Sequence, residues 1–145
     1  MKASELRLYH RLQVTAHRLR KAADRLLVDD AGLTTAQAAV LAIAARDTPV
    51  TQRDVAERLS LNESAVTAMV SRLIALGLLR RTRSATDGRA WLLSLTEEGR
   101  AARRKARQSF ASINARIEAS LAAKEIERLA DYLDRLSAGI GDSDP

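Results

Sequence analysis

Apolar residues recur every three or four positions over most of the chain, a spacing that predicts amphipathic helices. The first stripe predicts a helix over residues 4–28, with Ser4 as its N-cap and Gly32 as the residue that stops the chain from continuing. Its apolar positions are Leu8, Leu12, Leu19, Ala22 and Leu26, widened by Leu6, Ala16, Ala23 and Leu27.

Two shorter helices follow. Thr34 precedes the first, and Gln37 three residues later matches a capping box; this helix should end at residues 46–47. Thr51 caps the next, over residues 52–59. The positions expected in the core are Val40, Leu41, Ala44, Val55, Ala56 and Leu59.

A fourth helix over residues 63–76 is capped by Asn62 and stopped by Gly77. At about 100° per residue, its apolar side carries Val66, Val70, Leu73 and Ile74, with Met69 at the edge. Its other side is small, polar and singly basic, which suits a helix whose backbone must approach bases in a major groove. An alternative is a small-residue face packed on another helix. The predicted DNA contacts here are Asn62, Ser64, Ala65, Thr67, Ala68, Ser71 and Arg72.

Residues 78–84 and 90–95 are predicted strands, and the Asp-Gly pair between them indicates a hairpin. Its arginines should repel one another unless a polyanion lies beside them. Arg89 projects from the tip, where it can enter a narrow minor groove, and Asp87 could pair with it. Alternatively, the tip residues only form the turn. The predicted contacts are Arg80, Arg81, Arg83, Asp87, Gly88 and Arg89.

Two further helices complete the chain. Thr96 caps the fifth, and Gly99 in its first turn should cost little. A break is expected near residues 122–123, and an acidic, frayed tail from Gly139 onward. The predicted buried positions are Phe110, Ile113, Ile117 and Leu121 in the fifth helix, and Ile126, Leu129, Ala130, Leu133 and Leu136 in the sixth.

Together these elements predict a mainly α fold with a small β-hairpin wing (α+β): a winged helix-turn-helix over residues 33–95. Residues 1–32 and 96–145 would supply dimerisation helices, the latter with the acidic tail. The apolar faces of these terminal helices are larger than the small winged domain can bury. We therefore expect the helices to pair with those of a second copy in a homodimer. A monomer with a self-contained bundle is the alternative.

Composition agrees with a helical protein, since 46% of the 145 residues are hydrophobic, only 3% are aromatic and two are proline. No apolar run could span a bilayer and no signal sequence is evident, so a cytoplasmic protein without membrane association is expected. The net charge is +6, and residues 80–107 alone carry nine basic and three acidic residues. A localised basic region suggests a polyanion partner, although it could simply be a solvated surface.

No constellation of catalytic residues is evident, and neither a phosphate-binding loop nor a nucleophile elbow is present. His10 and His17 stand on one helix without a carboxylate cluster, and cysteine is absent. The sequence therefore predicts neither an enzyme nor a cofactor or metal site.

The chain resembles the MarR family of bacterial transcription regulators. The segments that carry the resemblance are LTTAQAAVL at 33–41, TQRDVAERLSLNESAVTAMVSRLIALGLLRR at 51–81 and DGRAWLLSLTEEGR at 87–100, with long helices at both ends. This resemblance implies a two-fold dimer on DNA controlled by small, often phenolic, ligands. It also implies that Asp87 and Arg89 form the wing-tip pair. Ser71 departs from the family, because many relatives carry an acidic residue there.

In this family the ligand pocket usually lies between the dimer helices and the winged domain. The candidate contacts for a small aromatic or anionic ligand are Tyr9, His10, His17 and Arg46. Each has a plainer interpretation, as dimer packing, a surface residue or a helix-end charge. The missing cysteine excludes thiol-oxidation sensing.

The predicted function is a dimeric, sequence-specific regulator that binds a pseudo-palindromic double-stranded DNA site. It would repress transcription by occluding a promoter, and a small molecule would release it. The alternative is an architectural or weakly specific DNA-binding protein without a ligand response.

Overall fold

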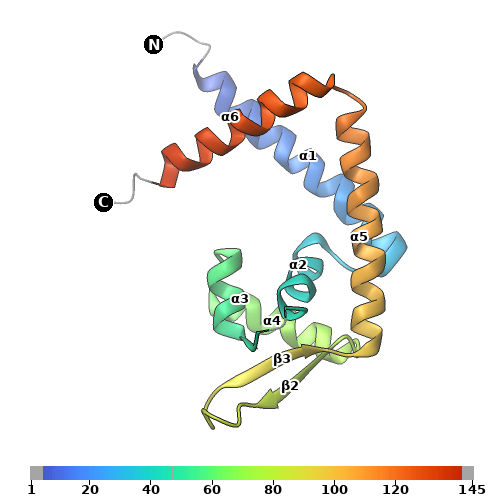
Figure 1. The fold of residues 1–145 in the computed structure, drawn as a ribbon, viewed down its shortest axis with the longest axis vertical. Helices are drawn as coiled ribbons and strands as arrows, with labels where there is room; N and C mark the ends of the chain where they lie inside the picture. Colours follow the sequence, from blue (N-terminus) through green and yellow to red (C-terminus); the bar gives the residue numbers. More distant parts are fainter. Residues whose placement is uncertain (1–4, 47, 142–145) are drawn as a thin grey trace. The chain divides into compact units, whose positions relative to one another are not determined.

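The computed structural model describes residues 5–46 and 48–141, so Ser4, Asp47 and residues 142–145 lie outside the described part of the chain. The chain forms two compact units, Met1–Ser109 and Phe110–Pro145. Its elements, labelled in Figure 1, are α1 (Glu5–Ala31), α2 (Thr35–Ala44), β1 (Val50–Thr51), α3 (Gln52–Leu59), α4 (Glu63–Ala75), β2 (Leu79–Arg83), β3 (Trp91–Leu95), α5 (Glu97–Glu118) and α6 (Ala123–Gly141). The predicted mainly helical fold with a small wing is confirmed.

The core of the first unit lies where α2, α3 and α4 pack on a small antiparallel sheet of order β1-β3-β2. Helices α3 and α4 supply the buried Val55, Val66, Val70 and Leu73, all on the sides predicted from their periodicity. The pairing of β1 with β3, which joins Val50 to Leu93, was not predicted. Two residues are too few to show the alternation by which a strand is recognised.

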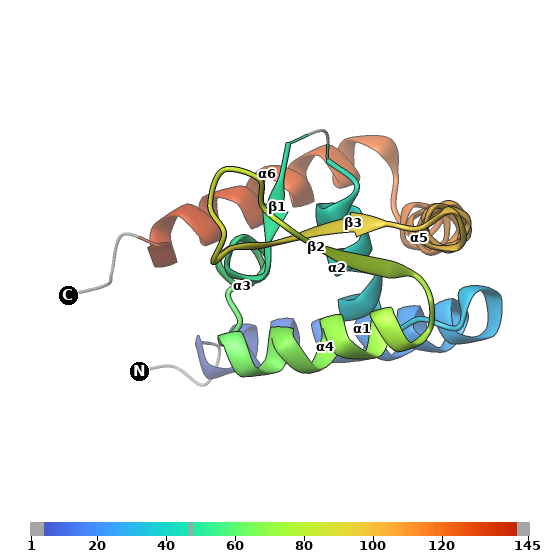
Figure 2. The ribbon, with the colours of Figure 1, turned by 90° about the horizontal axis from the view of Figure 1, so that it is seen from below.

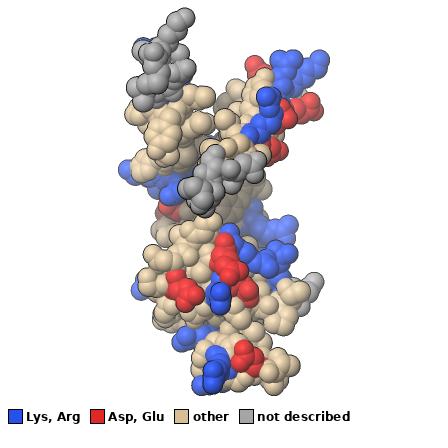
Figure 3. All heavy atoms as spheres, turned by 90° about the vertical axis from the view of Figure 1, so that its left-hand side faces the viewer, with Lys and Arg blue, Asp and Glu red and all other residues tan. Residues whose placement is uncertain are grey.

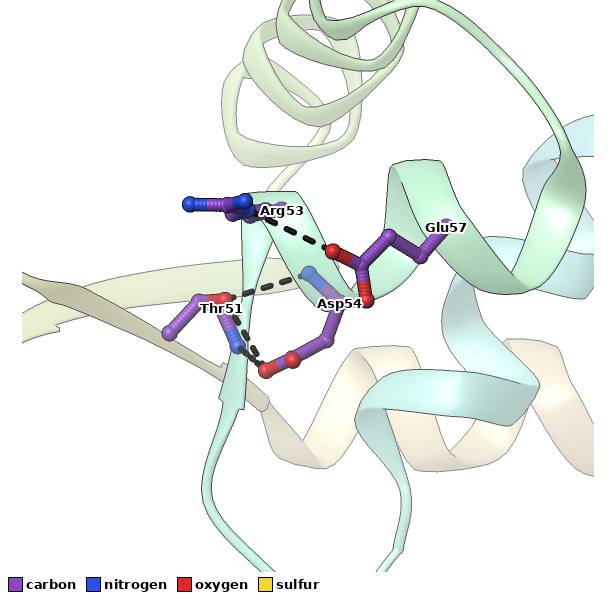
Figure 4. Close-up of polar contacts among 4 residues, drawn as sticks. All are labelled: Thr51, Arg53, Asp54 and Glu57. Atoms are coloured by element: carbon purple, nitrogen blue, oxygen red, sulfur yellow. Dashed lines mark hydrogen bonds and ion pairs between the residues drawn. The ribbon is translucent and has the colours of Figure 1, made fainter.

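The helix starts follow the predicted caps. The backbone N–H of Gln37 donates to Thr34 Oγ1 at 3.2 Å, and the Gln37 side chain accepts the Thr34 N–H at 3.0 Å. At α3 the Asp54 carboxylate accepts the backbone N–H of Thr51 at 2.8 Å and its hydroxyl at 2.9 Å (Figure 4). These bonds, the backbone one foremost, lower the pKa of Asp54.

The start of α5 is fixed more tightly than the sequence indicated. Thr96 accepts the Gly99 N–H at 2.9 Å and donates its hydroxyl to the Gly77 carbonyl at 2.6 Å. A Cβ at Gly99 would lie only 2.0 Å from the carbonyl oxygen of Leu78. The expectation that Gly99 costs little is therefore incomplete, because the helix approaches the α4–β2 connection so closely that only glycine fits.

Several predicted core positions are exposed on the single chain. In α1 the buried residues are Ala23 and Leu27, whereas Leu8 is 55% exposed. In α5 the buried positions include Ala102 and Ala106. Exposed apolar residues that were predicted to be buried are Leu12 and Leu19 in α1, Phe110 in α5, and Leu129, Leu133 and Leu136 in α6. The prediction that these positions are buried is therefore wrong for the single chain, which leaves the apolar rows of α1 and α6 exposed.

The helix ends differ from prediction by a few residues. α1 continues to Ala31, and Gly32 follows with the left-handed φ of 66° expected of a stop residue. α6 continues through Gly141, so the predicted frayed tail from Gly139 begins as helix. In the described part of the chain no single helix is long and apolar enough to cross a membrane; only α1 and α2 taken together, bent by 66°, pass that test.

Candidate nucleic-acid interface

The outward face of α4 contains the side chains predicted from periodicity. Ser64, Thr67, Ala68, Ser71 and Arg72 are all exposed, and Ala65 is half-buried at the margin. The opposite face is held in the core by three fully buried residues, so the rotation of α4 about its axis is fixed. The small exposed side chains leave the helix backbone accessible to a partner.

Several polar side chains of this region also make hydrogen bonds within the protein. The Asn62 side-chain oxygen accepts the backbone N–H of Ala65 and the hydroxyl of Ser64, both at 2.8 Å. Thr67 donates its hydroxyl to the Glu63 carbonyl at 2.8 Å and accepts from Gln52 Nε2 at 3.1 Å. Asn62 thus caps the helix, and the Thr67 methyl group remains the freer part of that side chain.

A network that the sequence did not reveal connects the wing to α3 and α4. Arg81 Nη1 donates to Gln52 Oε1 at 3.2 Å, and Gln52 donates in turn to Thr67. Arg81 and Arg83 also lie over the Trp91 ring, with guanidinium carbons 5.7 and 4.6 Å from its centre. A β2–β3 register that pairs Arg83 with Trp91 puts these side chains on one face.

This network changes the interpretation of the wing charge. The prediction assumed that its arginines repel one another until a polyanion neutralises them. The aromatic ring, Gln52 and the Gly88 carbonyl, which accepts from Arg83, instead engage two of the four within the protein. Basic and acidic side chains also lie side by side on the face drawn in Figure 3, so that face is not uniformly basic.

At the wing tip, the Asp87 carboxylate accepts the backbone N–H of Arg89 at 3.1 Å, and the Asp87 carbonyl accepts the Ala90 N–H at 3.0 Å. Among the described residues, Asp87 makes no ion pair with the Arg89 guanidinium, so the expected pairing is made through the backbone. Gly88 does not adopt a positive φ, unlike Gly32 and Gly77. The tip therefore fixes the backbone of Arg89 and leaves its side chain exposed.

The arginines of α4 and the wing fall into two groups, those that contact other residues of the protein and those that do not. Within residues 5–46 and 48–141, the guanidinium groups of Arg72, Arg80 and Arg89 have no hydrogen bond, ion pair or ring contact. They lie on α4, on β2 and at the wing tip, and each is exposed. Of the arginines on α4 and the wing, these three are available to an anionic partner, because Arg81 and Arg83 are engaged within the protein.

The four candidate ligand residues are not brought together. Tyr9, His10 and His17 are exposed on α1. Arg46 instead lies at the end of α2, where it lines a cavity beside β3 together with residues of α5. None of the three α1 residues lines that cavity.

Comparison with known proteins identifies the family. Residues 31–90 match the model of the MarR family. The PcaV transcriptional regulator from Streptomyces coelicolor, solved in complex with its natural ligand, is 35% identical, with 86% of this chain and 89% of that chain covered and a TM-score of 0.72. The chain belongs to the MarR family.

Two further MarR-family comparisons agree. A MarR-family transcriptional regulator from Rhodococcus sp. RHA1 superposes with a TM-score of 0.80 at 26% identity, covering 94% of this chain and 96% of that one. The HTH-type transcriptional repressor MdtR of Bacillus subtilis (strain 168) is 41% identical over 68 residues, 47% of this chain. That match spans only 44% of MdtR. The family is one of winged-helix transcription regulators, not of enzymes.

Proposed function

We propose that this MarR-family chain is a homodimeric repressor that binds a pseudo-palindromic double-stranded DNA site and is released by a small ligand. In this proposal α4 lies in the major groove and the wing tip reaches the adjacent minor groove. Because its partner is DNA, its place of action is the cytoplasm.

The observation that carries this proposal is the combination of the α4 face with the free Arg89. Hydroxyls of Ser64 and Ser71 can bond to bases or phosphates, and the Ala68 and Thr67 methyl groups suit thymine methyls. Arg72 and Arg80 can neutralise phosphates because nothing in the described chain engages them. Arg81 and Arg83 would serve the interface mainly by shaping the wing.

The exposed apolar rows of α1 and α6 support a dimer. Leu8, Leu12 and Leu19 of α1 would remain in water on an isolated chain, as would Leu133 and Leu136 of α6. These side chains are 40–55% exposed, so burying the rest of each stabilises an assembly by roughly half of the about 1.5–3 kcal/mol that complete burial contributes, before the cost of association. A two-fold dimer would present two copies of α4, which predicts two half-sites about one helical turn apart.

Repression and ligand release are supported by relatives. MdtR is a repressor and PcaV has been solved with its natural ligand. A dimer bound to a promoter blocks transcription without any further domain. A ligand that binds the DNA-free protein more tightly than the DNA-bound protein would lower the affinity for DNA, by the ratio of its two affinities.

Selection of bound duplexes from a random pool at physiological salt tests the proposal. The expected product is an inverted repeat with half-sites about one turn apart. The Ser71→Ala variant should select a repeat altered at a restricted set of positions, while Glu127→Ala on α6 is the matched surface control. Retention without enrichment of any sequence would indicate architectural binding instead.

A further inference from the structure

We infer that Gln52 is a positioning residue for DNA recognition. Its side-chain amide joins the wing to α4 and turns Thr67 so that the methyl group of Thr67 meets the C5-methyl group of a thymine. The inference deepens the proposed DNA-binding function and rests on it. Gln52 is the first residue of α3, and its side chain is half-buried.

The backbone that carries Gln52 is held in place from two sides. Thr51, directly before it, is bound by the Asp54 carboxylate at 2.8 Å and pairs with Leu92 of β3. In Figure 2 helix α3 is seen end-on, and it packs against both α4 and strand β3. The amide of Gln52 therefore extends from a rigid point toward two elements of the DNA-binding surface.

The two ends of the Gln52 amide have different partners. Arg81 Nη1 donates to Gln52 Oε1 at 3.2 Å, and a guanidinium group cannot accept, so the amide oxygen must face the wing. The amide nitrogen consequently faces α4, where it donates to Thr67 Oγ1 at 3.1 Å. One side chain thus connects strand β2 to α4.

The bond from Gln52 restricts the side chain of Thr67. A helical threonine divides between two rotamers, because its hydroxyl can reach the carbonyl three or four residues earlier. Here the Thr67 hydroxyl donates to the Glu63 carbonyl at 2.8 Å and accepts from Gln52, which together favour one rotamer. Thr67 is exposed, and its methyl group is the part left for a partner. Of the four ordinary bases only thymine presents a methyl group in the major groove, so an apolar contact here selects thymine.

The other end of the bridge steadies the wing. Arg81 lies between Gln52 and the Trp91 ring, with its guanidinium carbon 5.7 Å from the ring centre. A wing held in this way keeps Arg89 at the tip in a fixed position relative to α4. Trp91 is the only tryptophan of the chain and is 42% exposed, so its fluorescence reports on the bridge without DNA.

Duplexes of the selected inverted repeat in which single thymines are replaced by uracil test the contact, because uracil lacks only the C5-methyl group. The wild type should bind the thymine duplex about fourfold more tightly at one position of a half-site, the effect of burying one methyl group. Thr67→Ser keeps the hydroxyl and should lower this ratio to about one. Gln52→Met should lower it below about twofold, because Thr67 then divides between rotamers. Gln108→Met, the same change at an exposed position of α5, should leave it unaltered.

Quenching of Trp91 fluorescence by acrylamide, measured without DNA, tests the bridge itself. Gln52→Met should raise the quenching constant because Arg81 is no longer held over the ring, whereas Gln108→Met should not change it. Thr67→Ser retains the acceptor of the bridge and should also quench as the wild type does. That variant keeps the thymine contact testable if Gln52→Met fails to fold.

Three results would overturn the inference. They are an unchanged thymine-to-uracil ratio in Gln52→Met, an unchanged ratio in Thr67→Ser, and a Trp91 quenching constant that Gln52→Met does not raise. If the protein binds its inverted repeat and uracil weakens binding at no position, the inference fails while the proposed function stands. If no duplex is selected at all, both fail.

Discussion

Substituting alanine for Gly99 should destabilise the protein strongly although the change adds one methyl group to a helix. The new Cβ would lie 2.0 Å from the carbonyl oxygen of Leu78 and 3.0 Å from its carbonyl carbon. Carbon–oxygen contacts rarely fall below about 3.3 Å, so the backbone of β2 or α5 must move by about 1 Å. The atoms that must yield are backbone atoms, which cannot rotate away as a long side chain would.

The magnitude follows from the contacts disturbed. Overpacking of this kind costs about 1–3 kcal/mol, and displacing the Leu78 carbonyl also strains the bond it accepts from the Thr96 N–H at 3.2 Å, worth about 1 kcal/mol. Alanine regains less than about 1 kcal/mol through its higher helix propensity. The net loss should be about 2–3 kcal/mol, or a fall in Tm of roughly 5–10 °C.

Urea and thermal unfolding at fixed protomer concentration would measure this, since the proposed dimerisation would make stability depend on concentration. Gly139→Ala in α6 is the matched control, because a Cβ there meets nothing within 4 Å. It should be neutral or stabilising by up to about 0.5–1 kcal/mol. Equal stability of Gly99→Ala and wild type would refute the close-approach argument.

Other substitutions test the interface and the caps. Arg89→Ala should weaken specific DNA binding by about 1–3 kcal/mol in an anisotropy titration; unchanged affinity would remove the wing tip from the interface. Arg80→Gln should lower the slope of log K against log salt by about one, whereas an unaltered slope would mean that the side chain points away from DNA. Trp91→Leu removes the ring over which Arg81 and Arg83 lie and so loosens the wing that positions Arg89; it should weaken DNA binding by about 1 kcal/mol, and retained affinity would exclude this role of the ring. The pKa of Asp54 is lowered below 3.8, so its stabilisation is present above that pH and lost as pH falls through the folded-state pKa. Asp54→Asn should therefore flatten the loss of stability as the pH falls below about 4 in urea unfolding, and an identical acid profile would exclude this role.

Short sequence patterns were enough to predict most helices and strands of the winged domain. Thr34 and Gln37 form the predicted capping box, and Gly77 has the left-handed φ expected after α4. The rotation of α4 followed from periodicity alone because Val66 and Val70 are fully buried against one compact core. These features depend on neighbours within one or two turns, which a sequence displays directly.

Features that depend on distant neighbours were missed. The requirement for Gly99 comes from Leu78, and the engagement of Arg81 comes from Gln52, 29 residues earlier in the chain. Contacts between residues so far apart in the chain cannot be predicted from the spacing of neighbouring residues. Phe110 was expected to be buried yet is 37% exposed, because an apolar stripe indicates that a face will be covered without indicating whether the cover is the same chain.

The central claim is that two copies of α4 read two half-sites at a fixed spacing. The most direct measurement is the affinity of the protein for its selected inverted repeat, compared with the same repeat carrying five extra base pairs between the half-sites. That insertion turns one half-site by about half a helical turn. A dimer that reads both half-sites at once should bind the lengthened duplex about a hundredfold or more weakly, close to its affinity for random DNA at the same salt. Equal affinity for both duplexes would contradict it and would favour independent or non-specific binding.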